Sequence, residues 1–355
     1  MRLLLTFWVC MLPCALWSQL KTPIHLNDGW TTDHMLNVGM DTTLFHRFFE
    51  VFEAEDHKVQ SILLVKEGKL VLERYYNGQG INDHHTIRSV SKSVVSLLAG
   101  IALDQGLFSL DDLVSARLTE LSTAKNQSES KQSIQLRHLL NMNTGLECND
   151  WDKKSKGQED RVYKKKNWLQ VLADLPMVRQ PGDSSLYCSG GVLMLAAIIE
   201  RTSGLTLQEY AQKYLFDPLD IEDPEWNHTN KGEVITAGKR LYLKARDMAH
   251  LGQLVLNKGQ WNGQQVVPQA WIETIGQPET TITGLNYSHL WWHLPFQKDG
   301  LGVKSICATG NGGQYILVFP EYELVAVFTG KAYNSPDQRL PFSIVNRLIL
   351  PSIKP

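Results

Sequence analysis

Two pairs of short apolar runs, one pair near each end of the chain, dominate the hydrophobic pattern. They are rich in β-branched and aromatic residues, as strands are. A short polar turn separates the two runs of each pair, and each pair therefore predicts a β-hairpin. The four runs are residues 61–65, 70–76, 314–319 and 324–328.

Helices are predicted between the two hairpins. Residues 91–107, 191–201 and 246–257 have the length and apolar density of buried helices. The polar stretch 122–133 has no apolar period and predicts a solvated loop. Strands from both chain ends would have to meet in one antiparallel sheet flanked by helices. The pattern thus predicts an α+β fold with a helical insert at about 108–240, rather than two sequential domains.

The first 18 residues have the pattern of a secretory signal peptide. Arg2 is followed by an apolar run from Leu3 to Leu16 and then by a small residue, Ser18. The run is shorter than the roughly 20 residues of a membrane-spanning helix, although an uncleaved anchor stays an alternative. No later apolar stretch is long enough to span a membrane. We therefore expect cleavage near Ser18 and export, either periplasmic or secreted, of a single domain at 19–355.

Composition and charge exclude several classes of function. The chain has 355 residues, with 35 Lys and Arg against 37 Asp and Glu, and 43% of its residues are hydrophobic. These values are typical of a globular protein and exclude a disordered chain or a small disulfide scaffold. A formal charge of -2 without a basic stripe gives no basis for nucleic-acid binding.

Ser89-Val90-Ser91-Lys92 is the leading catalytic candidate. A Ser and a Lys three residues apart on a helix lie on one face, so the amine can take the hydroxyl proton. The same spacing recurs at Ser122 and at Ser128, but both lie in the polar stretch. Only Ser89 opens a long apolar helix, where free backbone N–H groups add to its reactivity. The alternative is a serine that merely caps the helix.

Two further segments carry candidate chemistry. Tyr187 lies on a loop before an apolar helix, and a tyrosine near cationic groups can act as a base; a core tyrosine is the alternative. Residues 308–314, Ala-Thr-Gly-Asn-Gly-Gly-Gln, precede the second hairpin. Glycines there allow a ligand close to the backbone, and a main-chain N–H can complete an oxyanion hole. The alternative is an ordinary glycine-rich turn.

Together, these segments resemble the serine β-lactamase and penicillin-binding-protein superfamily. The resemblance is to the branch of class C β-lactamases, related esterases and 6-aminohexanoate-dimer hydrolases, and it covers roughly Ser61 to Leu350. It also includes Leu136–Leu146, Ala245–Ala249 and Leu254–Trp271. It implies a β-lactamase/transpeptidase-like fold.

The resemblance also implies a role for each motif residue. Ser89 would be the acylated nucleophile, Lys92 its proton-transfer partner and Tyr187 the general base of a Tyr-x-Asn motif. The backbone N–H groups of Ser89 and Asn311, beside Gly310, would form the oxyanion hole. The reaction would be acyl transfer to serine followed by hydrolysis, with no metal or organic cofactor. The histidines show no metal-ligand spacing, in agreement with that expectation.

The sequence departs from the family at two substrate-binding positions. Ser189 stands where Tyr-x-Asn has its amide, and a hydroxyl does not have the reach of an amide. Ala308 stands where β-lactamases and D-alanyl-D-alanine peptidases carry the lysine that binds a substrate carboxylate. The hydrolase and esterase branch often has Ala-Ser-Gly there, followed by Gly-Gln, as at Gln314. This favours ester or amide hydrolysis, although a remote Arg or Lys could substitute.

Three cysteines remain after signal cleavage. Cys148 and Cys188 lie in loops that the resemblance places beside one cleft, so we expect a disulfide between them and a free Cys307. Three reduced core cysteines are the alternative. Tyr287 and the segment 290–293 are expected either in an aromatic wall of the cleft or in the core of the sheet.

The sequence therefore predicts an exported serine hydrolase of a small ester or amide. A D-alanyl-D-alanine carboxypeptidase or β-lactamase using the same residues is one alternative, and it needs a cationic group near Ala308. A non-catalytic, ligand-binding homologue is the other. The expected partner is a small-molecule substrate, and the sequence leaves the oligomeric state open.

Overall fold

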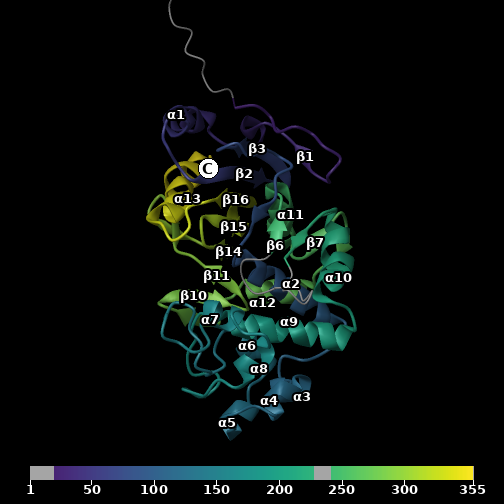
Figure 1. The fold of residues 1–355 in the computed structure, drawn as a ribbon. Helices are drawn as coiled ribbons and strands as arrows, with labels where there is room; N and C mark the ends of the chain where they lie inside the picture. Colours follow the sequence, from purple (N-terminus) through teal and green to yellow (C-terminus); the bar gives the residue numbers. More distant parts are fainter. Residues whose placement is uncertain (1–19, 228–240, 355) are drawn as a thin grey trace, which may run out of the picture.

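Nine strands from both ends of the chain form the central sheet in the computed structural model, which describes residues 20–227 and 241–354 (Figure 1). The order is β1-β3-β2-β16-β15-β14-β11-β10-β9. β1 pairs in parallel with β3, and the other neighbours are antiparallel. The bounds are Thr31–Thr32 (β1), Val59–Lys66 (β2), Lys69–Tyr75 (β3), Thr280–Ile282 (β9), Leu285–Ser288 (β10), Trp291–His293 (β11), Ile306–Gly310 (β14), Gln314–Phe319 (β15) and Leu324–Gly330 (β16).

Both predicted hairpins are present at the centre of this sheet. Glu67 and Gly68 join β2 to β3 with φ angles of 54° and 74°, the left-handed backbone that a two-residue hairpin turn needs. All eight residues of β2 are buried, because the strand is covered on both faces. β2 pairs with β16, so strands that are 258 or more residues apart lie side by side. The expected α+β class, with a sheet built from both chain ends, is confirmed.

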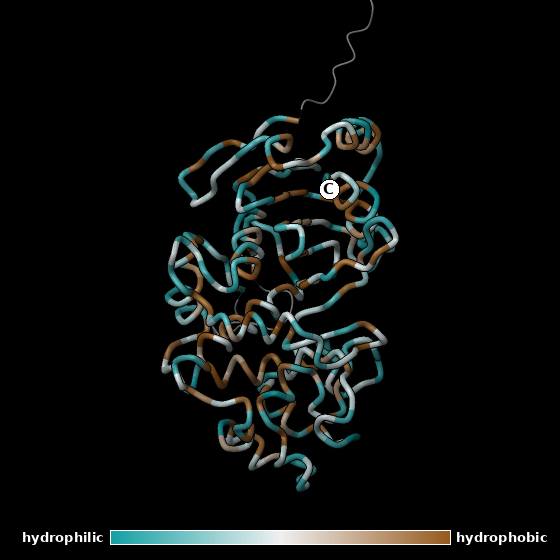
Figure 2. The backbone as a smooth tube through the Cα atoms, turned by 180° about the vertical axis from the view of Figure 1, so that it is seen from behind, coloured by the Kyte–Doolittle hydropathy of each residue, from teal (hydrophilic) through white to brown (hydrophobic). Residues whose placement is uncertain are grey.

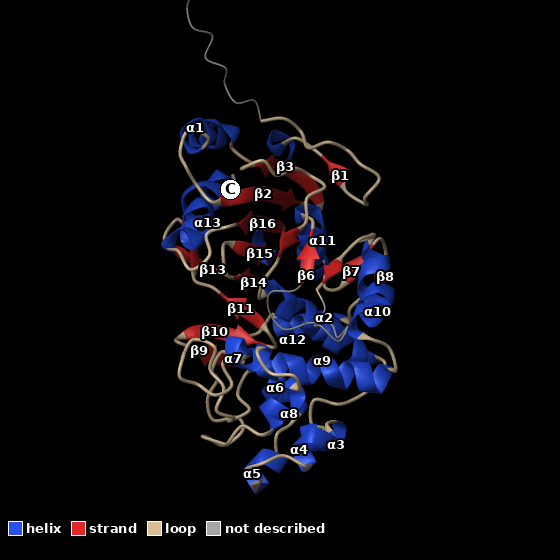
Figure 3. Ribbon diagram, in the orientation of Figure 1, coloured by secondary structure: helices blue, strands red, loops and turns tan. Residues whose placement is uncertain are grey.

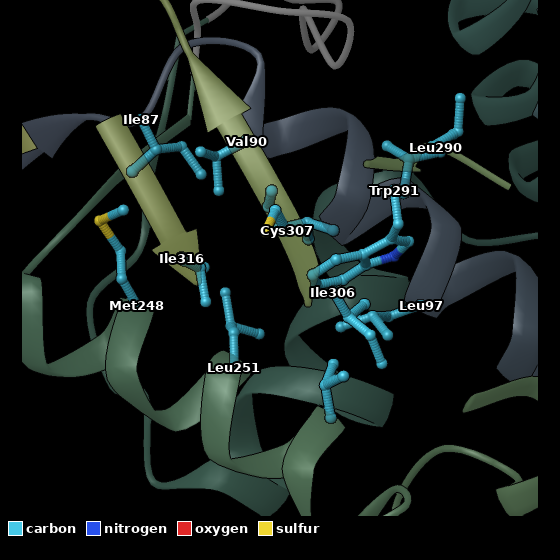
Figure 4. Close-up of a cluster of buried hydrophobic side chains, with 14 of the residues drawn as sticks. Ile87, Val90, Leu97, Met248, Leu251, Leu290, Trp291, Ile306, Cys307 and Ile316 are labelled. Atoms are coloured by element: carbon cyan, nitrogen blue, oxygen red, sulfur yellow. The ribbon is translucent and has the colours of Figure 1, made fainter. Parts of the chain in front are cut away.

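Helices cover both faces of the sheet (Figure 3). Successive residues of β15 identify the two layers, because neighbouring side chains on a strand point to opposite faces. Ile316 points toward Met248 and Leu251 of α11 (Ala245–Leu256), as Figure 4 shows. The ring of Tyr315 instead packs 4.9 Å from that of Phe342 in α13 (Leu340–Ile344). The helix α1 (Thr42–Phe52) lies near α13, beside the first strands (Figure 1).

A second, helical region lies below the sheet in Figure 1. At its centre α2 (Val90–Asp104) and α9 (Ser189–Ser203) pack together. Thirteen residues of α2 and eleven of α9 are buried. In Figure 2 both the inner helices and the strands include long hydrophobic stretches, drawn in brown. The remaining helical segments are α3 (Val114–Arg117), α4 (Thr119–Ser122), α5 (Glu129–Gln132), α6 (Leu136–Leu140), α7 (Glu159–Tyr163), α8 (Trp168–Ala173), α10 (Leu207–Ala211), α12 (Gln269–Ile275) and α14 (Leu350–Ser352), with η1 (Met35–Val38), η2 (Gln212–Phe216), η3 (Asp217–Leu219), η4 (Pro320–Tyr322), η5 (Pro336–Arg339) and η6 (Val345–Ile349).

Among the described residues, seven short strands lie outside the main sheet. A three-stranded sheet has the order β4-β6-β5, and two-stranded sheets join β12 to β13 and β7 to β8. β4 lies directly before the turn that leads into α2, and it pairs with β6. The bounds are His85–Thr86 (β4), Glu225–Trp226 (β5), Leu241–Leu243 (β6), Gln260–Trp261 (β7), Gln264–Gln265 (β8), Phe296–Lys298 (β12) and Leu301–Val303 (β13).

The prediction of a solvated loop at 122–133 is wrong in part. Residues Glu129–Gln132 form α5, and the side chain of Lys131 is buried. Its Nζ donates to the carbonyl oxygens of Lys125 at 2.9 Å and Ala173 at 2.8 Å. Sequence periodicity missed this segment because a single buried lysine, rather than an apolar face, attaches it to the core.

No single helix in the described residues is both long enough and apolar enough to cross a membrane. The bent pair Ser189–Ser203 and Leu207–Leu219 meets these two criteria only when its two parts are joined. The predicted signal peptide at 1–18 lies outside the described residues.

Candidate active site

Ser89 lies at a sharp turn between β4 and α2. The preceding residue, Arg88, has a φ of 52°, a left-handed conformation that is uncommon for a residue with a long side chain. Ser89 already has helical dihedrals, with φ -71° and ψ -7°, but its side chain makes no capping hydrogen bond. The alternative of a helix-capping serine is therefore wrong. The turn instead leaves the hydroxyl exposed to a cavity.

Lys92 lies one helical turn further on, and its side chain is buried. Its Nζ donates to Ser89 Oγ at 3.0 Å. Burial lowers the pKa of this ammonium, but Tyr187, Glu159 and Asp150 together outweigh burial and raise the pKa above its ordinary value. Lys92 is accordingly a cation at neutral pH, and its charge lies against the candidate nucleophile.

Tyr187 faces Lys92 from the loop before α9. The lysine Nζ lies 5.1 Å from the centre of the tyrosine ring. The ring stacks on Trp151 at 5.0 Å with an interplanar angle of 3°, and on Trp292 at 5.9 Å. Only 9% of Tyr187 is exposed, so the two tryptophan rings hold its ring in place while it still lines the cavity.

A disulfide joins Cys148 to Cys188, with their Cα atoms 5.5 Å apart. It connects the loop that contains Trp151 to the loop that contains Tyr187. Cys307 is the free cysteine of the described residues, and it is buried in β14.

The edge of β14 approaches the same turn closely. A Cβ on Gly310 would lie 2.5 Å from the carbonyl oxygen of Ile87 and 3.0 Å from Cβ of Arg88, so only glycine fits there. Within residues 20–227 and 241–354, the backbone N–H groups of Ser89 and Asn311 donate to no protein acceptor. Asn311 itself is held through its side chain, since Nδ2 donates to Asn334 Oδ1 at 3.0 Å.

Three residues that were expected to bind substrate are buried behind the cavity wall. Ala308 is fully buried. Gln314 forms two hydrogen bonds with the backbone of Gly330, at 2.5 and 3.3 Å. Ser189 donates to the carboxylate of Asp150. None of the three lines the cavity in this structure, so their contact with substrate stays a prediction.

The other two Ser-x-x-Lys segments have no such geometry. Ser122 Oγ donates to the carbonyl of Thr119 at 2.8 Å. Ser128 Oγ accepts from the backbone N–H of Lys131 at 3.1 Å and so caps α5. In both segments the serine hydroxyl is engaged with the backbone rather than with the lysine amine.

A cavity of about 930 Å³ contains Ser89, Tyr187, Gly310 and Asn311 on its wall. Trp292 reaches it, whereas Tyr287 and Trp291 are buried in the core, so the aromatic segment serves both expected roles. Sequence reasoning missed further residues of the wall, among them Arg88, Asp150, Trp151, Lys153, Glu159 and Tyr333. The proximity of Asp150 and Trp151 to Cys148 was the available signal for two of them.

The cavity is lined by three acidic side chains and by the cations Arg88 and Lys153. Asp150, Glu159 and Asp160 come from the segment around α7. Arg88 stacks over the ring of Tyr333, with Cζ 4.3 Å from the ring centre. Its Nε is buried and has no hydrogen-bond partner among the described residues. The cavity therefore offers an acidic wall beside Lys92 and a cationic group beside the serine.

This arrangement can perform acyl transfer. It combines a serine hydroxyl, a buried lysine and a fixed tyrosine with two unoccupied backbone donors at the edge of one cavity. These are the parts that nucleophilic attack on a carbonyl carbon needs.

Comparison with known proteins agrees with this chemistry. The family described as Beta-lactamase matches residues 51–344. A 6-aminohexanoate-dimer hydrolase from Paenarthrobacter ureafaciens is 25% identical over 299 residues, which are 78% of this chain and 73% of that protein. A lovastatin esterase from Penicillium rubens is 26% identical over 196 residues, 51% of this chain and 48% of the esterase.

A solved structure shares the fold. A variant of simvastatin synthase from Aspergillus terreus superposes with a TM-score of 0.67 at 15% identity, covering 89% of this chain and 95% of that one. The family match spans most of the chain, including the turn at Ser89 and the edge of β14. The chain therefore belongs to the β-lactamase family of serine hydrolases, which includes esterases, amidases, carboxypeptidases and β-lactamases.

Proposed function

We propose that this protein hydrolyses a small ester or amide through an acyl-enzyme on Ser89. The contact between Lys92 Nζ and Ser89 Oγ, at 3.0 Å, carries the proposal. It distinguishes this serine from those of the other two segments with the same spacing, whose hydroxyls bond to the backbone.

In the proposed acylation, Ser89 Oγ attacks the substrate carbonyl carbon while Tyr187 takes the hydroxyl proton. The Lys92 ammonium compensates the negative charge that Tyr187 and the attacking oxygen carry during this transfer. The N–H groups of Ser89 and Asn311 donate to the carbonyl oxygen as it becomes an oxyanion. The bond to the leaving group then breaks, and Tyr187 returns its proton to the leaving oxygen or nitrogen.

Deacylation reverses these roles. A water molecule attacks the acyl carbon and gives its proton to Tyr187. The bond between the acyl carbon and Ser89 Oγ breaks, and the serine oxygen recovers that proton. No oxidant or further reactant is needed, because water supplies both parts of the hydrolysis.

The names of two relatives support an ester or amide substrate. The relative from Paenarthrobacter ureafaciens is named as a hydrolase of the 6-aminohexanoate dimer, and the relative from Penicillium rubens as an esterase. A carboxypeptidase or β-lactamase is the second candidate, because Arg88, whose Nε has no hydrogen-bond partner among the described residues, places a guanidinium on the cavity wall with the serine, where Ala308 supplies no charge. We further propose export of the mature chain, which the pattern of residues 1–18 and the Cys148–Cys188 disulfide support.

The first test replaces the nucleophile. We expect Ser89→Ala to lower hydrolysis of a short-chain p-nitrophenyl ester by at least about 10³-fold, since no other group can form the acyl-enzyme. Ser122→Ala is the matched control, because it removes an exposed serine of the same Ser-x-x-Lys spacing, and it should hydrolyse the ester at the wild-type rate.

A chromogenic cephalosporin measured beside the ester separates the two candidates. Turnover of the ester alone supports the esterase or amidase, and strong turnover of the cephalosporin supports the β-lactamase. A serine-directed fluorophosphonate that fails to label Ser89 in the folded wild type would contradict the catalytic proposal and favour a ligand-binding homologue.

A further inference from the structure

Asp150 receives an unusual set of hydrogen bonds at the start of α9. Its Oδ2 accepts from both the backbone N–H and the hydroxyl of Ser189, each at 2.7 Å. Its Oδ1 accepts from the backbone N–H of Glu159 at 2.9 Å. The N-cap residue of α9, Cys188, makes no side-chain capping bond, so Asp150 caps this helix from a different part of the chain.

The hydroxyl of Ser189 is thereby occupied. A serine has one hydrogen to donate, and here it is directed to Asp150 at 2.7 Å, with Glu159 Oε2 as a second acceptor at 3.3 Å. Ser189 is also buried and does not line the cavity. Position 189 consequently serves as a link between α9 and two carboxylates, rather than as a donor to substrate.

Asp150 is also attached directly to the tyrosine loop. Its backbone N–H donates to the carbonyl oxygen of Tyr187 at 2.8 Å. The next residue, Trp151, stacks on the ring of Tyr187. Two residues before Asp150, Cys148 forms the disulfide with Cys188. Three separate contacts thus fix the segment 148–151 to the segment 187–189, with Asp150 in the middle.

The carboxylate of Asp150 is half-buried, and it interacts electrostatically with Lys92. Burial raises the pKa of Asp150, and the charge of Lys92 and the hydrogen bonds from Ser189 oppose that effect. Asp150, Glu159 and Tyr187 are the groups that in turn favour the charged form of Lys92. A buried carboxylate is costly unless it is paired, and its partners here are the candidate catalytic lysine and the helix that follows the candidate base.

We propose that Asp150 is a positioning residue for acyl transfer, which holds Tyr187 against Lys92 and keeps Lys92 a cation. It touches no reacting atom. It acts through its hydrogen bonds with Ser189, through its hydrogen bond with the backbone of Tyr187 and through its charge. The part of Ser189 is then to bind this carboxylate. This inference rests on the proposed function, because it assigns Lys92 the part of a charged partner and Tyr187 that of the base.

The test compares Asp150→Asn with Asp152→Asn. Both variants remove one negative charge from the same loop, but the side chain of Asp152 accepts only from the backbone of Lys154 among the described residues. The readout is the rate at which a fluorophosphonate labels Ser89 across a range of pH, which needs no knowledge of the substrate. Thermal unfolding of each variant verifies that it is folded at the assay temperature.

We expect Asp150→Asn to slow labelling at neutral pH by about 10- to 100-fold, because the base is displaced from its partners. The alkaline limb of the pH profile should move to lower pH, because Lys92 loses its proton more readily without the negative neighbour. Asp150→Glu keeps the negative charge, so the alkaline limb of its pH profile should lie at the wild-type pH. Asp152→Asn should match the wild type in both rate and limb.

Labelling by Asp150→Asn at the wild-type rate, with an unmoved limb, would overturn the inference while leaving the proposed function intact. If that variant does not fold, Ser189→Ala decides. This variant removes one hydrogen bond to Asp150 and keeps the Asp150 charge. Labelling should therefore slow several-fold while the alkaline limb of the pH profile stays in place. An unchanged labelling rate would contradict the inference. Absence of labelling in the wild type would instead contradict the proposed function.

Discussion

Asp247 illustrates how a single buried carboxyl couples stability to pH. It lies in the first turn of α11, where it accepts from the backbone N–H of Lys244 at 3.0 Å. Burial raises its pKa to about 6, against the opposing effect of that hydrogen bond and of the Lys244 charge. Because the folded pKa exceeds the ordinary one, its stabilising contribution is complete below about pH 4 and is lost as the pH rises through 6.

Asp247→Asn should therefore stabilise the fold at neutral pH. The amide keeps an acceptor for Lys244 and never has to ionise in a buried site. A pKa raised by about two units corresponds to about 3 kcal/mol in the free energy of unfolding at pH 8, and the gain should vanish below about pH 4. Denaturant unfolding at several pH values measures the difference, with Glu129→Gln, an exposed acid in the first turn of α5, as the control. A gain that does not depend on pH would contradict this account.

Among the single residues of the site, those that belong to sequence motifs could be predicted from the sequence. Ser89, Lys92 and Tyr187 were proposed from their spacing and context, and the structure places all three together. Asp150 and Arg88 could not be predicted, because their roles depend on contacts across the fold. The bond from Ser189 to Asp150 joins residues 39 positions apart, and no local pattern encodes it.

Among the elements, the loop between the two bonded cysteines contributes most to the cavity. Cys148 and Cys188 enclose a segment with a sequence separation of 40 that includes α7 and α8. Trp151 and Glu159 reach the cavity from this segment. Closing a loop of this length reduces the entropy of the unfolded chain, which favours the folded state.

Cys148→Ala combined with Cys188→Ala should lower the free energy of unfolding by about 4 kcal/mol. Activity should fall as well, because Tyr187 is adjacent to the bond that is lost. A reducing agent should lower the melting temperature of the wild type and of Cys307→Ala, yet leave the double variant unchanged. Mass spectrometry of an unreduced digest checks the bond itself, and two free thiols in it would refute the pairing.

In the whole molecule, Arg246 connects three distant parts of the chain. From α11, its guanidinium donates to Glu73 of β3 at 2.7 and 2.6 Å, to Asp28 at 2.7 Å and to the carbonyl oxygen of Ile24 at 2.7 Å. Its partners, above all Glu73, raise its pKa against the effect of burial. The first described segment of the chain is thereby fixed to the sheet and to the helix that covers it.

Arg246→Ala should destabilise the protein by about 3 to 5 kcal/mol, because it leaves Glu73 buried without its partner. The measurement is denaturant unfolding, together with limited proteolysis of residues 20–30. Arg201→Ala, which breaks an ion pair with Glu120 nearer the surface, should cost no more than about 1 kcal/mol. Equal losses in the two variants would show that burial is not the cause.

The long strands of the sheet could be predicted from the sequence, and the short ones could not. The hairpins 61–76 and 314–328 carry strong apolar patterns, and they form the middle of the sheet. β1, β9 and β11, each with three residues or fewer, have too little pattern to be predicted. Likewise, α5 is attached by the buried Lys131, which a search for apolar periodicity does not detect.

The position of the disulfide has an evolutionary consequence. Ser89 and Lys92 lie at the start of α2 and Asn311 directly follows β14, whereas Trp151 and Glu159 belong to the segment between the two bonded cysteines. Substitutions in this segment that spare Asp150 and Tyr187 would reshape the cavity wall while Ser89 and Lys92 stay in place. A chain that keeps these two residues and both cysteines can therefore change its substrate preference around one reaction centre.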